Sequence, residues 1–332
     1  MAKLLDIRGL KLEFRSYRGV VKALDGVDLA VAPAEILGLV GESGCGKTIT
    51  GMAVLGLLAK PQAQVTSGEI LFKGDDLLKK SEGEMRALRG REISMVFQDP
   101  LASLNPVFTV GDQIARVIRE HKGVSRSEAL EATRSALSAT GLPDHGGLLG
   151  SYPHQLSGGM RQRVCMAMAI SCDSHLLIAD EPTTALDVTI QMQILRLLIG
   201  LRDDRGVAQL LVTHNLGVAA QTCDQIAVMY AGQVVEQGPT IEVIKRPYHP
   251  YTTALYGCLP QGKLAADLST IPGSVPDLID PPAGCRFHPR CTHVQAECAA
   301  QKPALIDVGP GHQVACHWVG RLGVVPGERM HA

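Results

Sequence analysis

The residues from Gly41 to Thr48 have the types and the spacing that bind a chain of phosphates. They read GESGCGKT, so that Gly41 is followed after four residues by Gly46, Lys47 and Thr48. In this P-loop pattern the backbone N–H groups of a glycine-rich turn surround the phosphates, and the next helix presents its positive N-terminal end. Lys47 would reach the β- and γ-phosphates, and the Thr48 hydroxyl would ligate Mg²⁺. The expected nucleotide contacts are Gly41, Glu42, Ser43, Gly44, Cys45, Gly46, Lys47, Thr48 and Ile49. The alternative is a glycine-rich turn that matches the pattern by chance.

Further polar residues follow apolar stretches that are typical of buried strands. Asp180 and Glu181 follow Leu176–Ala179, and such a strand end supplies the acidic residue that helps hold Mg²⁺ in P-loop enzymes. We expect Asp180 to support the metal and Glu181 to orient and polarise the attacking water. His214 and Gln98 also follow strands, so His214 could contact the γ-phosphate and Gln98 could reach the metal or the water. Taken singly, each residue is also consistent with a solvated strand end or a structural side chain.

A second anion-binding surface is predicted at the sequence LSGGM. Ser157 is a natural N-cap, and Gly158 and Gly159 would expose backbone N–H groups at the start of a helix. Ser157 lies 110 residues after Lys47, beyond a predicted helical insert. We therefore do not expect it to fold back onto the nucleotide that the same chain binds through Lys47.

The elements that must position these residues indicate an α/β fold with a parallel sheet. Residues 4–14 and 20–31 are predicted to be β-strands of a meander that leads into an apolar strand at 36–40. Apolar residues at helical spacing between 103 and 140 predict a helical insert. Strands then alternate with helices between 176 and 230, which favours parallel pairing.

Composition excludes several classes of protein. The 332 residues are 45% apolar, and 32 basic residues balance 33 acidic ones for a net charge of −1. This balance, without long blocks of one sign, does not favour non-specific binding to nucleic acid. No stretch approaches the roughly 20 apolar residues of a membrane helix, and the charged N-terminus does not resemble a secretory signal. We expect a cytoplasmic protein, which would need another chain to span a membrane.

The cysteines are concentrated near the C-terminus, in a proline-rich tail that begins at about residue 260. Cys285, Cys291, Cys298 and Cys316 fit neither the usual zinc spacing nor the ferredoxin runs. From spacing alone they could bind zinc, bind an iron–sulfur cluster or remain free. Cys45 is separate from this group, and its position near a helix N-terminus predicts an acidified thiol that is sensitive to alkylation.

In this order and spacing, GESGCGKT, FQDP, LSGGMRQR, LLIADEPTTALD and VTHN resemble an ABC-transporter nucleotide-binding subunit. The resemblance implies a RecA-like core at 1–98 and 165–260 with an N-terminal antiparallel β part, and a helical subdomain at about 99–164. A loop-rich, cysteine-containing extension at 261–332 would follow this ATP-binding domain of residues 1–260.

The same resemblance implies a head-to-tail dimer with two ATP molecules, in which the LSGGM helix of one subunit closes on the nucleotide of the other. Residues 185–187, ending at Asp187, would join the two sites, and Gln98 would link the site to the helical insert. Tyr17 resembles the aromatic residue that stacks on adenine, with Phe14 as a rival. Ala34 stands where a glycine is usual in the family, which would stiffen a turn.

The C-terminal part, with MYAGQVVEQGP, RPYHPYTTAL and GCRFHPRC, resembles the dipeptide and oligopeptide importers, a branch that includes nickel and glutathione importers. This resemblance implies an ATPase at the cytoplasmic face of the inner membrane, with two permease subunits, a solute-binding protein and a second, non-identical ATPase subunit. It also implies a [4Fe–4S] cluster on the four cysteines of the tail. The alternatives are a soluble ABC ATPase without a membrane partner, and a tail that regulates the ATPase as a redox sensor.

Overall fold

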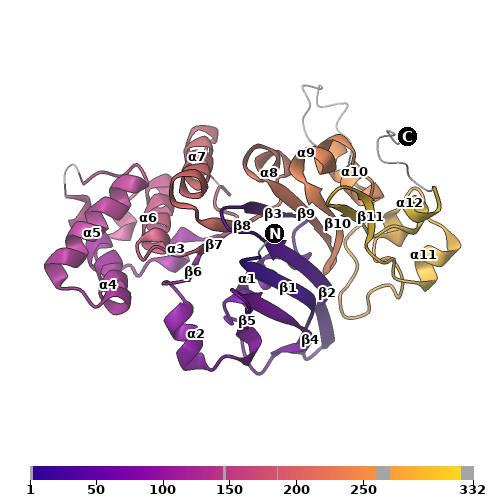
Figure 1. The fold of residues 1–332 in the computed structure, drawn as a ribbon, viewed down its shortest axis with the longest axis horizontal. Helices are drawn as coiled ribbons and strands as arrows, with labels where there is room; N and C mark the ends of the chain where they lie inside the picture. Colours follow the sequence, from indigo (N-terminus) through magenta and orange to yellow (C-terminus); the bar gives the residue numbers. More distant parts are fainter. Residues whose placement is uncertain (1–2, 145–146, 185, 259–269, 323–332) are drawn as a thin grey trace. The chain divides into compact units, whose positions relative to one another are not determined.

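The computed structural model describes residues 3–144, 147–184, 186–258 and 270–322 (Figure 1). By its internal contacts the chain divides into two compact units. The first contains Ala32–Glu35 and Lys79–Leu211, and the second contains Lys3–Val31, Ile36–Leu78 and the chain from Val212 onward. The P-loop, Tyr17 and His214 belong to the second unit, whereas the other predicted site residues of the nucleotide belong to the first.

The second unit begins with an antiparallel sheet in the order β2-β1-β4-β5. Its strands are β1 (Leu5–Ser16), β2 (Gly19–Val31), β4 (Ala63–Phe72) and β5 (Asp75–Asp76). Apolar side chains of β1, among them Leu5, Ile7, Leu10 and Leu12, are buried. Their burial accounts for the alternation in the sequence and confirms the predicted antiparallel strands.

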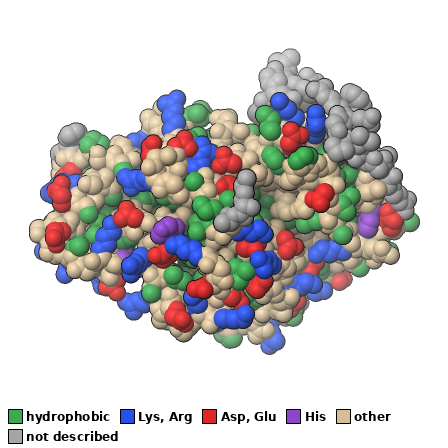
Figure 2. All heavy atoms as spheres, in the orientation of Figure 1, with side chains coloured by type: hydrophobic (Ala, Val, Ile, Leu, Met, Phe, Trp, Pro, Cys, Tyr) green, Lys and Arg blue, Asp and Glu red, His purple; other side chains and the backbone are tan. Residues whose placement is uncertain are grey.

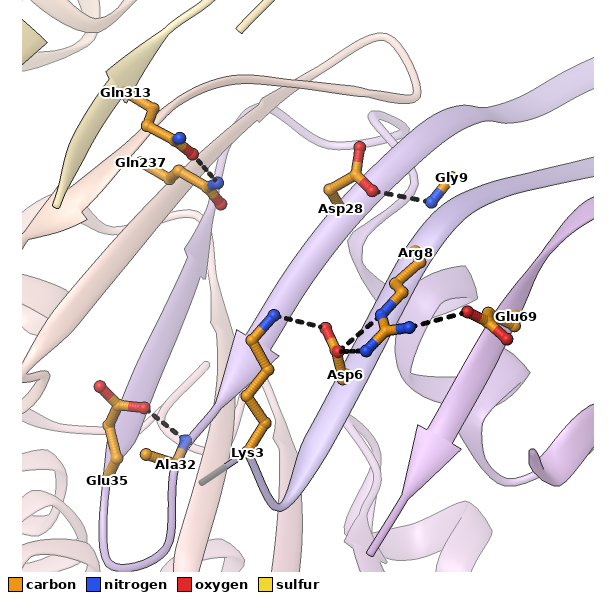
Figure 3. Close-up of polar contacts among 10 residues, drawn as sticks. All are labelled: Lys3, Asp6, Arg8, Gly9, Asp28, Ala32, Glu35, Glu69, Gln237 and Gln313. Carbon is orange, nitrogen blue, oxygen red and sulfur yellow. Dashed lines mark hydrogen bonds and ion pairs between the residues drawn. The ribbon is translucent and has the colours of Figure 1, made fainter. Parts of the chain in front are cut away.

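Polar contacts at one end of this sheet fix the first strand (Figure 3). The Asp6 carboxylate accepts hydrogen bonds from Lys3 Nζ at 2.9 Å and Arg8 Nε at 2.7 Å, and Arg8 Nη1 reaches Glu69 Oε1 on β4 at 3.1 Å. These contacts hold the pKa of Asp6 below its ordinary value, although burial opposes that shift. The carboxylate therefore stays charged and tied to both neighbours at neutral pH.

A second set of strands in the same unit follows the order β11-β12-β10-β9-β3. β3 (Ile36–Val40) is parallel to β9 (Gln225–Tyr230), and β10 (Gln233–Pro239) is antiparallel to β9 and β12. β11 (Ile306–Gly309) and β12 (His312–Val314) come from the tail, and Gln237 on β10 donates to Gln313 on β12 at 2.9 Å (Figure 3). The tail is thus loop-rich as expected, but it also extends a sheet of the ATP-binding part.

The helices of this unit are α1 (Lys47–Val54), α8 (Leu216–Thr222), α9 (Thr240–Lys245), α10 (Pro250–Gly257), α11 (Ala296–Ala300) and α12 (His317–Leu322). Val308, Val314 and Val319 of the tail form a small buried cluster with Tyr248. This cluster joins the described part of the tail to the chain before it.

In the first unit, strands follow the order β8-β7-β6. β6 (Ile93–Val96) and β7 (Leu176–Asp180) are parallel, and β8 (Ala208–Thr213) begins in this unit. The helices are α2 (Glu82–Leu88), α3 (Pro100–Ser103), α4 (Val110–Lys122), α5 (Arg126–Ala139), α6 (Gly158–Ile170) and α7 (Val188–Arg205). α4, α5 and α6 pack against one another (Figure 1), which confirms the helical insert expected between residues 103 and 140.

The helix ends follow from residue type. Thr109 caps α4, Ser125 and Glu128 form a capping box on α5, and Gly123 ends α4 in the left-handed conformation. At the surface, basic and acidic side chains are interspersed on the face shown in Figure 2, as the nearly balanced composition predicts.

Candidate nucleotide-binding and hydrolysis site

The P-loop joins β3 to α1 and depends on glycine at positions where a side chain has no room. A Cβ on Gly41 would lie 2.1 Å from the carbonyl oxygen of Met229 on β9. Gly46 has φ of +107° and a Cβ there would lie 2.8 Å from Leu24 Cδ2. These close approaches explain the two outer glycines of the pattern, since larger residues would displace the loop from the strands beside it.

Lys47 is the first residue of α1 and is only 5% exposed. Its Nζ donates hydrogen bonds to the carbonyl oxygens of Gly41 at 2.8 Å and Glu42 at 3.0 Å. Gly46 caps the helix without a side-chain hydrogen bond to the first turn. The loop therefore holds an ammonium group and the backbone N–H groups of a helix start together, which is the arrangement that binds phosphate.

Glu42 is held by two residues that the sequence did not single out. Its backbone N–H donates to Tyr251 Oη at 2.9 Å, and its carboxylate accepts from Arg290 Nη1 at 2.7 Å and Nη2 at 3.1 Å. Arg290 lies 248 residues further along the chain. No local pattern in the sequence could have indicated this partner.

The prediction of an acidified Cys45 is wrong. The side chain is fully buried, and that burial raises the pKa of the thiol, against the opposing effect of the Lys47 charge. The helix N-terminus that suggested acidity is therefore outweighed by desolvation, because a buried thiolate loses its hydration. Cys45 is a packing residue of the loop in this conformation.

In the first unit, the structure brings Glu181 and Gln98 together. They follow β7 and β6, which are parallel and therefore end at the same edge. Glu181 Oε2 accepts hydrogen bonds from Gln98 Nε2 at 3.0 Å and Thr184 Oγ1 at 2.9 Å. Glu181 also has φ of +46°, an unfavourable conformation for a residue with a side chain, and Asp180 before it is 2% exposed. Strained backbone of this kind is common where a reactive side chain must be aimed.

The LSGGM sequence forms the start of α6, as predicted. Ser157 is the N-cap and its hydroxyl accepts from the Met160 N–H at 3.3 Å. Ser157 and Gly158 are exposed, whereas a Cβ on Gly159 would lie 2.9 Å from Ile190 Cγ2. This helix start is therefore accessible to a ligand and requires a small residue at Gly159.

The remaining candidates lie at turns and helix starts. Asp187 caps α7 and accepts from the Ile190 N–H at 2.9 Å, while Ala185 lies outside the described residues. In the second unit, Tyr17 occupies the turn between β1 and β2 and is 98% exposed, whereas Phe14 is half-buried on β1. His214 follows β8 and is exposed.

Comparisons with known proteins agree with these features. The ABC transporter family profile matches residues 24–184, and the profile "Oligopeptide/dipeptide transporter, C-terminal region" matches residues 235–298. The chain is 46% identical to the dipeptide transport ATP-binding protein DppD of Bacillus subtilis, over 95% of each chain. It is 45% identical to DppD of Escherichia coli, over 95% of this chain and 96% of that one. The chain belongs to the ATP-binding proteins of ABC transporters.

Solved structures support the fold of this ABC ATPase. CbiO1 from Clostridium perfringens, described as part of the ABC transporter complex CbiONQ, has a TM-score of 0.63 and 27% identity over 74% of this chain and 92% of its own. A dimeric ATP-binding cassette bound to ADP and phosphate has a TM-score of 0.65 over 71% of this chain and 98% of its own, at 24% identity. The predicted P-loop ABC cassette is thus confirmed, and ATP hydrolysis coupled to transport is its activity.

Membership of this family settles only part of the predicted ligands and partners. ATP with Mg²⁺ is the expected nucleotide, and the family implies a dimeric cassette with membrane permeases. In the described part of the chain, no helix has both the length and the apolar character to cross a bilayer.

The four tail cysteines of the ABC ATPase lie close enough to influence one another. Burial, together with the neighbouring Cys316, Cys298 and Cys291, raises the pKa of Cys285 to about 11, against the opposing effect of a hydrogen bond from the Phe287 N–H. Within residues 3–144, 147–184, 186–258 and 270–322, however, no three His, Cys, Asp or Glu side chains are arranged to hold a metal ion. The structure therefore does not support the predicted [4Fe–4S] cluster, because the described side chains are not placed to hold a metal ion.

Proposed function

We propose that this ABC ATPase drives the import of dipeptides or oligopeptides. The proposal is supported by the names of its relatives, since two proteins at 45–46% identity over nearly their whole length are dipeptide transport ATP-binding proteins. The C-terminal match at residues 235–298 points to the same class of transporter. The complex would contain two permeases, a peptide-binding protein and a second, non-identical ATPase subunit at the cytoplasmic face of the inner membrane.

In this proposal the two units of the chain supply different parts of the chemistry. Lys47 and the P-loop N–H groups bind the phosphates, and Tyr17 stacks on the adenine. Thr48 and Gln98 would ligate Mg²⁺ with support from Asp180, and the bound metal would neutralise phosphate charge. The hydrogen bonds from Gln98 and Thr184 to Glu181 favour a fixed carboxylate orientation, which suits a residue that positions the attacking water. His214 would contact the γ-phosphate.

The exposed Ser157–Gly159 start of α6 favours a site that two subunits complete together. Each subunit would present this helix start to the nucleotide on the partner's P-loop, and the Asp187 loop would connect the two sites. The proposed ATP-binding domain covers residues 1–260, with its helical subdomain at about 99–164, and the extension covers 261–332. Opening and closing of such a dimer would be transmitted to the permeases.

The role of Glu181 is tested by Glu181→Gln in the assembled transporter. The amide keeps the size of the carboxylate and one acceptor oxygen but cannot accept a proton from water, so hydrolysis should fall by roughly 100-fold or more while ATP binding is retained. A matched control is Glu131→Gln, which removes an exposed carboxylate that pairs with Arg134 on α5. Wild-type turnover in Glu181→Gln would remove Glu181 from this role.

The transported solute is tested in proteoliposomes that contain the complex and its binding protein. Labelled dipeptides, oligopeptides, nickel and glutathione are compared for ATP-dependent uptake. Peptide uptake that is lost in Glu181→Gln supports the proposal. Uptake of nickel or glutathione alone, or ATP hydrolysis by a chain that associates with no permease, would replace it with one of the rival functions.

A further inference from the structure

A short segment of the C-terminal extension, Arg286–Arg290, contacts the nucleotide-binding loop directly. The Arg290 guanidinium forms a two-pronged ion pair with the Glu42 carboxylate, at 2.7 and 3.1 Å. Its side chain is 5% exposed, against 26% for Glu42. It also lies over the rings of Tyr230 and Phe287, at 5.7 and 6.0 Å from the ring centres. An arginine fork of this geometry is specific for its carboxylate partner, and lysine reproduces it poorly.

The other end of the segment is anchored on the body of the same unit. Arg286 is 4% exposed and donates to the carbonyl oxygens of Ala231, in the turn between β9 and β10, and Lys22 on β2. It also pairs with Asp25 at 3.5 Å. Both arginines are buried and paired, so each end of the segment is fixed to the rest of the unit.

The contacts of Glu42 lead from this segment to the phosphate-binding lysine. The Glu42 side chain is held by Arg290 and its backbone N–H by Tyr251 Oη, while its carbonyl oxygen accepts from Lys47 Nζ. Tyr251 packs on Phe287 of the same segment, with ring centres 5.4 Å apart. Glu42, one of the two residues whose carbonyl oxygens hold the Lys47 ammonium, is thus itself held on two sides.

We propose that Arg290 is a positioning residue for ATP binding, which fixes Glu42 and through it the P-loop and Lys47. The C-terminal extension then acts on the nucleotide site through the loop that binds the phosphates. The inference uses the proposed role of Lys47 and does not depend on which solute is transported. ATP binding by the wild-type complex, and its loss in Lys47→Ala, test the role of Lys47 separately.

The test measures KM for ATP and kcat in the assembled transporter that carries Arg290→Ala. A misplaced P-loop should raise KM by about tenfold, with a smaller change in kcat, because the groups that act on water are untouched. Arg290→Lys should restore part of the loss. Lys302→Ala is the matched control, since it removes a positive charge from the same extension that contacts Asp25 and is 42% exposed. It should leave KM unchanged.

A second measurement distinguishes positioning from a general loss of stability. Cys45 lies inside the P-loop and is fully buried, so its rate of maleimide modification, followed by peptide mass spectrometry, reports on the loop itself. Arg290→Ala should accelerate this modification, and saturating ATP should restore protection.

The Glu42→Gln variant keeps the proposal testable if Arg290→Ala does not fold. Glu42→Gln alone should raise KM in the same way, and the Arg290→Lys/Glu42→Gln double variant should show less than the sum of the two single effects, because both changes break one contact. The proposal is overturned if Arg290→Ala or Glu42→Gln shows both the KM for ATP and the Cys45 protection of the wild type. Additive effects of the two changes would overturn it as well.

Discussion

His249 should make the stability of this ABC ATPase fall as the pH is lowered from 7 to 5. It is the N-cap of α10, is 1% exposed, and its Nδ1 accepts a hydrogen bond from the Tyr251 N–H at 3.0 Å. A protonated imidazole could not accept this bond, and its charge would be buried. Burial accordingly lowers the pKa of His249 to about 3, from 6.5 in an unfolded chain.

The sign and the size of the effect follow from this difference in pKa. Between pH 6.5 and pH 3 the unfolded chain takes up a proton at His249 that the folded chain does not, so stability is complete above pH 6.5 and is lost as the pH falls. At 1.36 kcal/mol per pH unit, the loss from this one group between pH 7 and pH 5 is about 2 kcal/mol. Asp25 contributes in a different range. Despite the opposing effect of burial, hydrogen bonding from Gln233 and the charges of Lys302 and Arg286 lower its pKa to about 2, so its contribution is lost only below about pH 4.

The measurement is urea unfolding at pH 7, 6 and 5, compared between the wild type and His249→Asn. Asparagine keeps an N-cap acceptor but has no proton to gain in this range. Trp318, the single tryptophan of the chain, packs against the cluster that contains Tyr248 and therefore reports unfolding of this region by fluorescence. The wild type should lose about 2 kcal/mol more than the variant between pH 7 and 5. Parallel loss of stability in the two proteins would refute the assignment of a buried, neutral His249.

Two further predictions concern backbone conformation. Ala34 has φ of +54°, so Ala34→Gly should stabilise the protein by about 0.5–1 kcal/mol in urea unfolding. The same change at Ala132 inside α5 should cost about 1 kcal/mol. Destabilisation at both positions would contradict the strain at Ala34. Gly41→Ala should shift β9 at Met229 or prevent folding, and it should lower the free energy of unfolding by about 3 kcal/mol or more. Binding of a fluorescent ATP analogue should be abolished. Wild-type binding of the analogue would show that the loop has room for a side chain.

The sequence alone predicted the parts of the site that depend on local chemistry. The glycine spacing predicted the P-loop turn, and the serine in LSGGM predicted the cap of α6, because both follow from backbone conformation and hydrogen bonding within a few residues. Strands were expected to alternate with helices up to residue 230, and β9 ends at Tyr230. The helix α7 continues to Arg205 and ends there because Gly206 adopts the left-handed conformation.

What the sequence could not predict depends on burial and on contacts between distant segments. The acidity expected for Cys45 considered the helix N-terminus but not the desolvation of a fully buried thiol. The strands β11 and β12 have only four and three residues, and they are stabilised by pairing with β10 and not by their own apolar pattern. Arg290 and Glu42 are 248 residues apart, so no periodic pattern in the sequence could indicate their ion pair.

A buried carboxylate explains why the tail and the nucleotide loop behave as one structure. Glu236 on β10 is fully buried and accepts hydrogen bonds from the backbone N–H groups of Tyr248 and His249 and from His312 Nε2 of the tail, at 2.8, 2.9 and 2.8 Å. A carboxylate can be buried at such a position only if its partners stay in place. The segment that Glu236 fixes leads directly into α10, whose Tyr251 holds the backbone of Glu42 in the P-loop. Glu42 in the P-loop is therefore held both by Tyr251 of the YHPY sequence and by Arg290 of the cysteine-rich tail. A change in the tail that displaced Tyr251 or Arg290 would alter ATP binding before it altered the chemistry of hydrolysis.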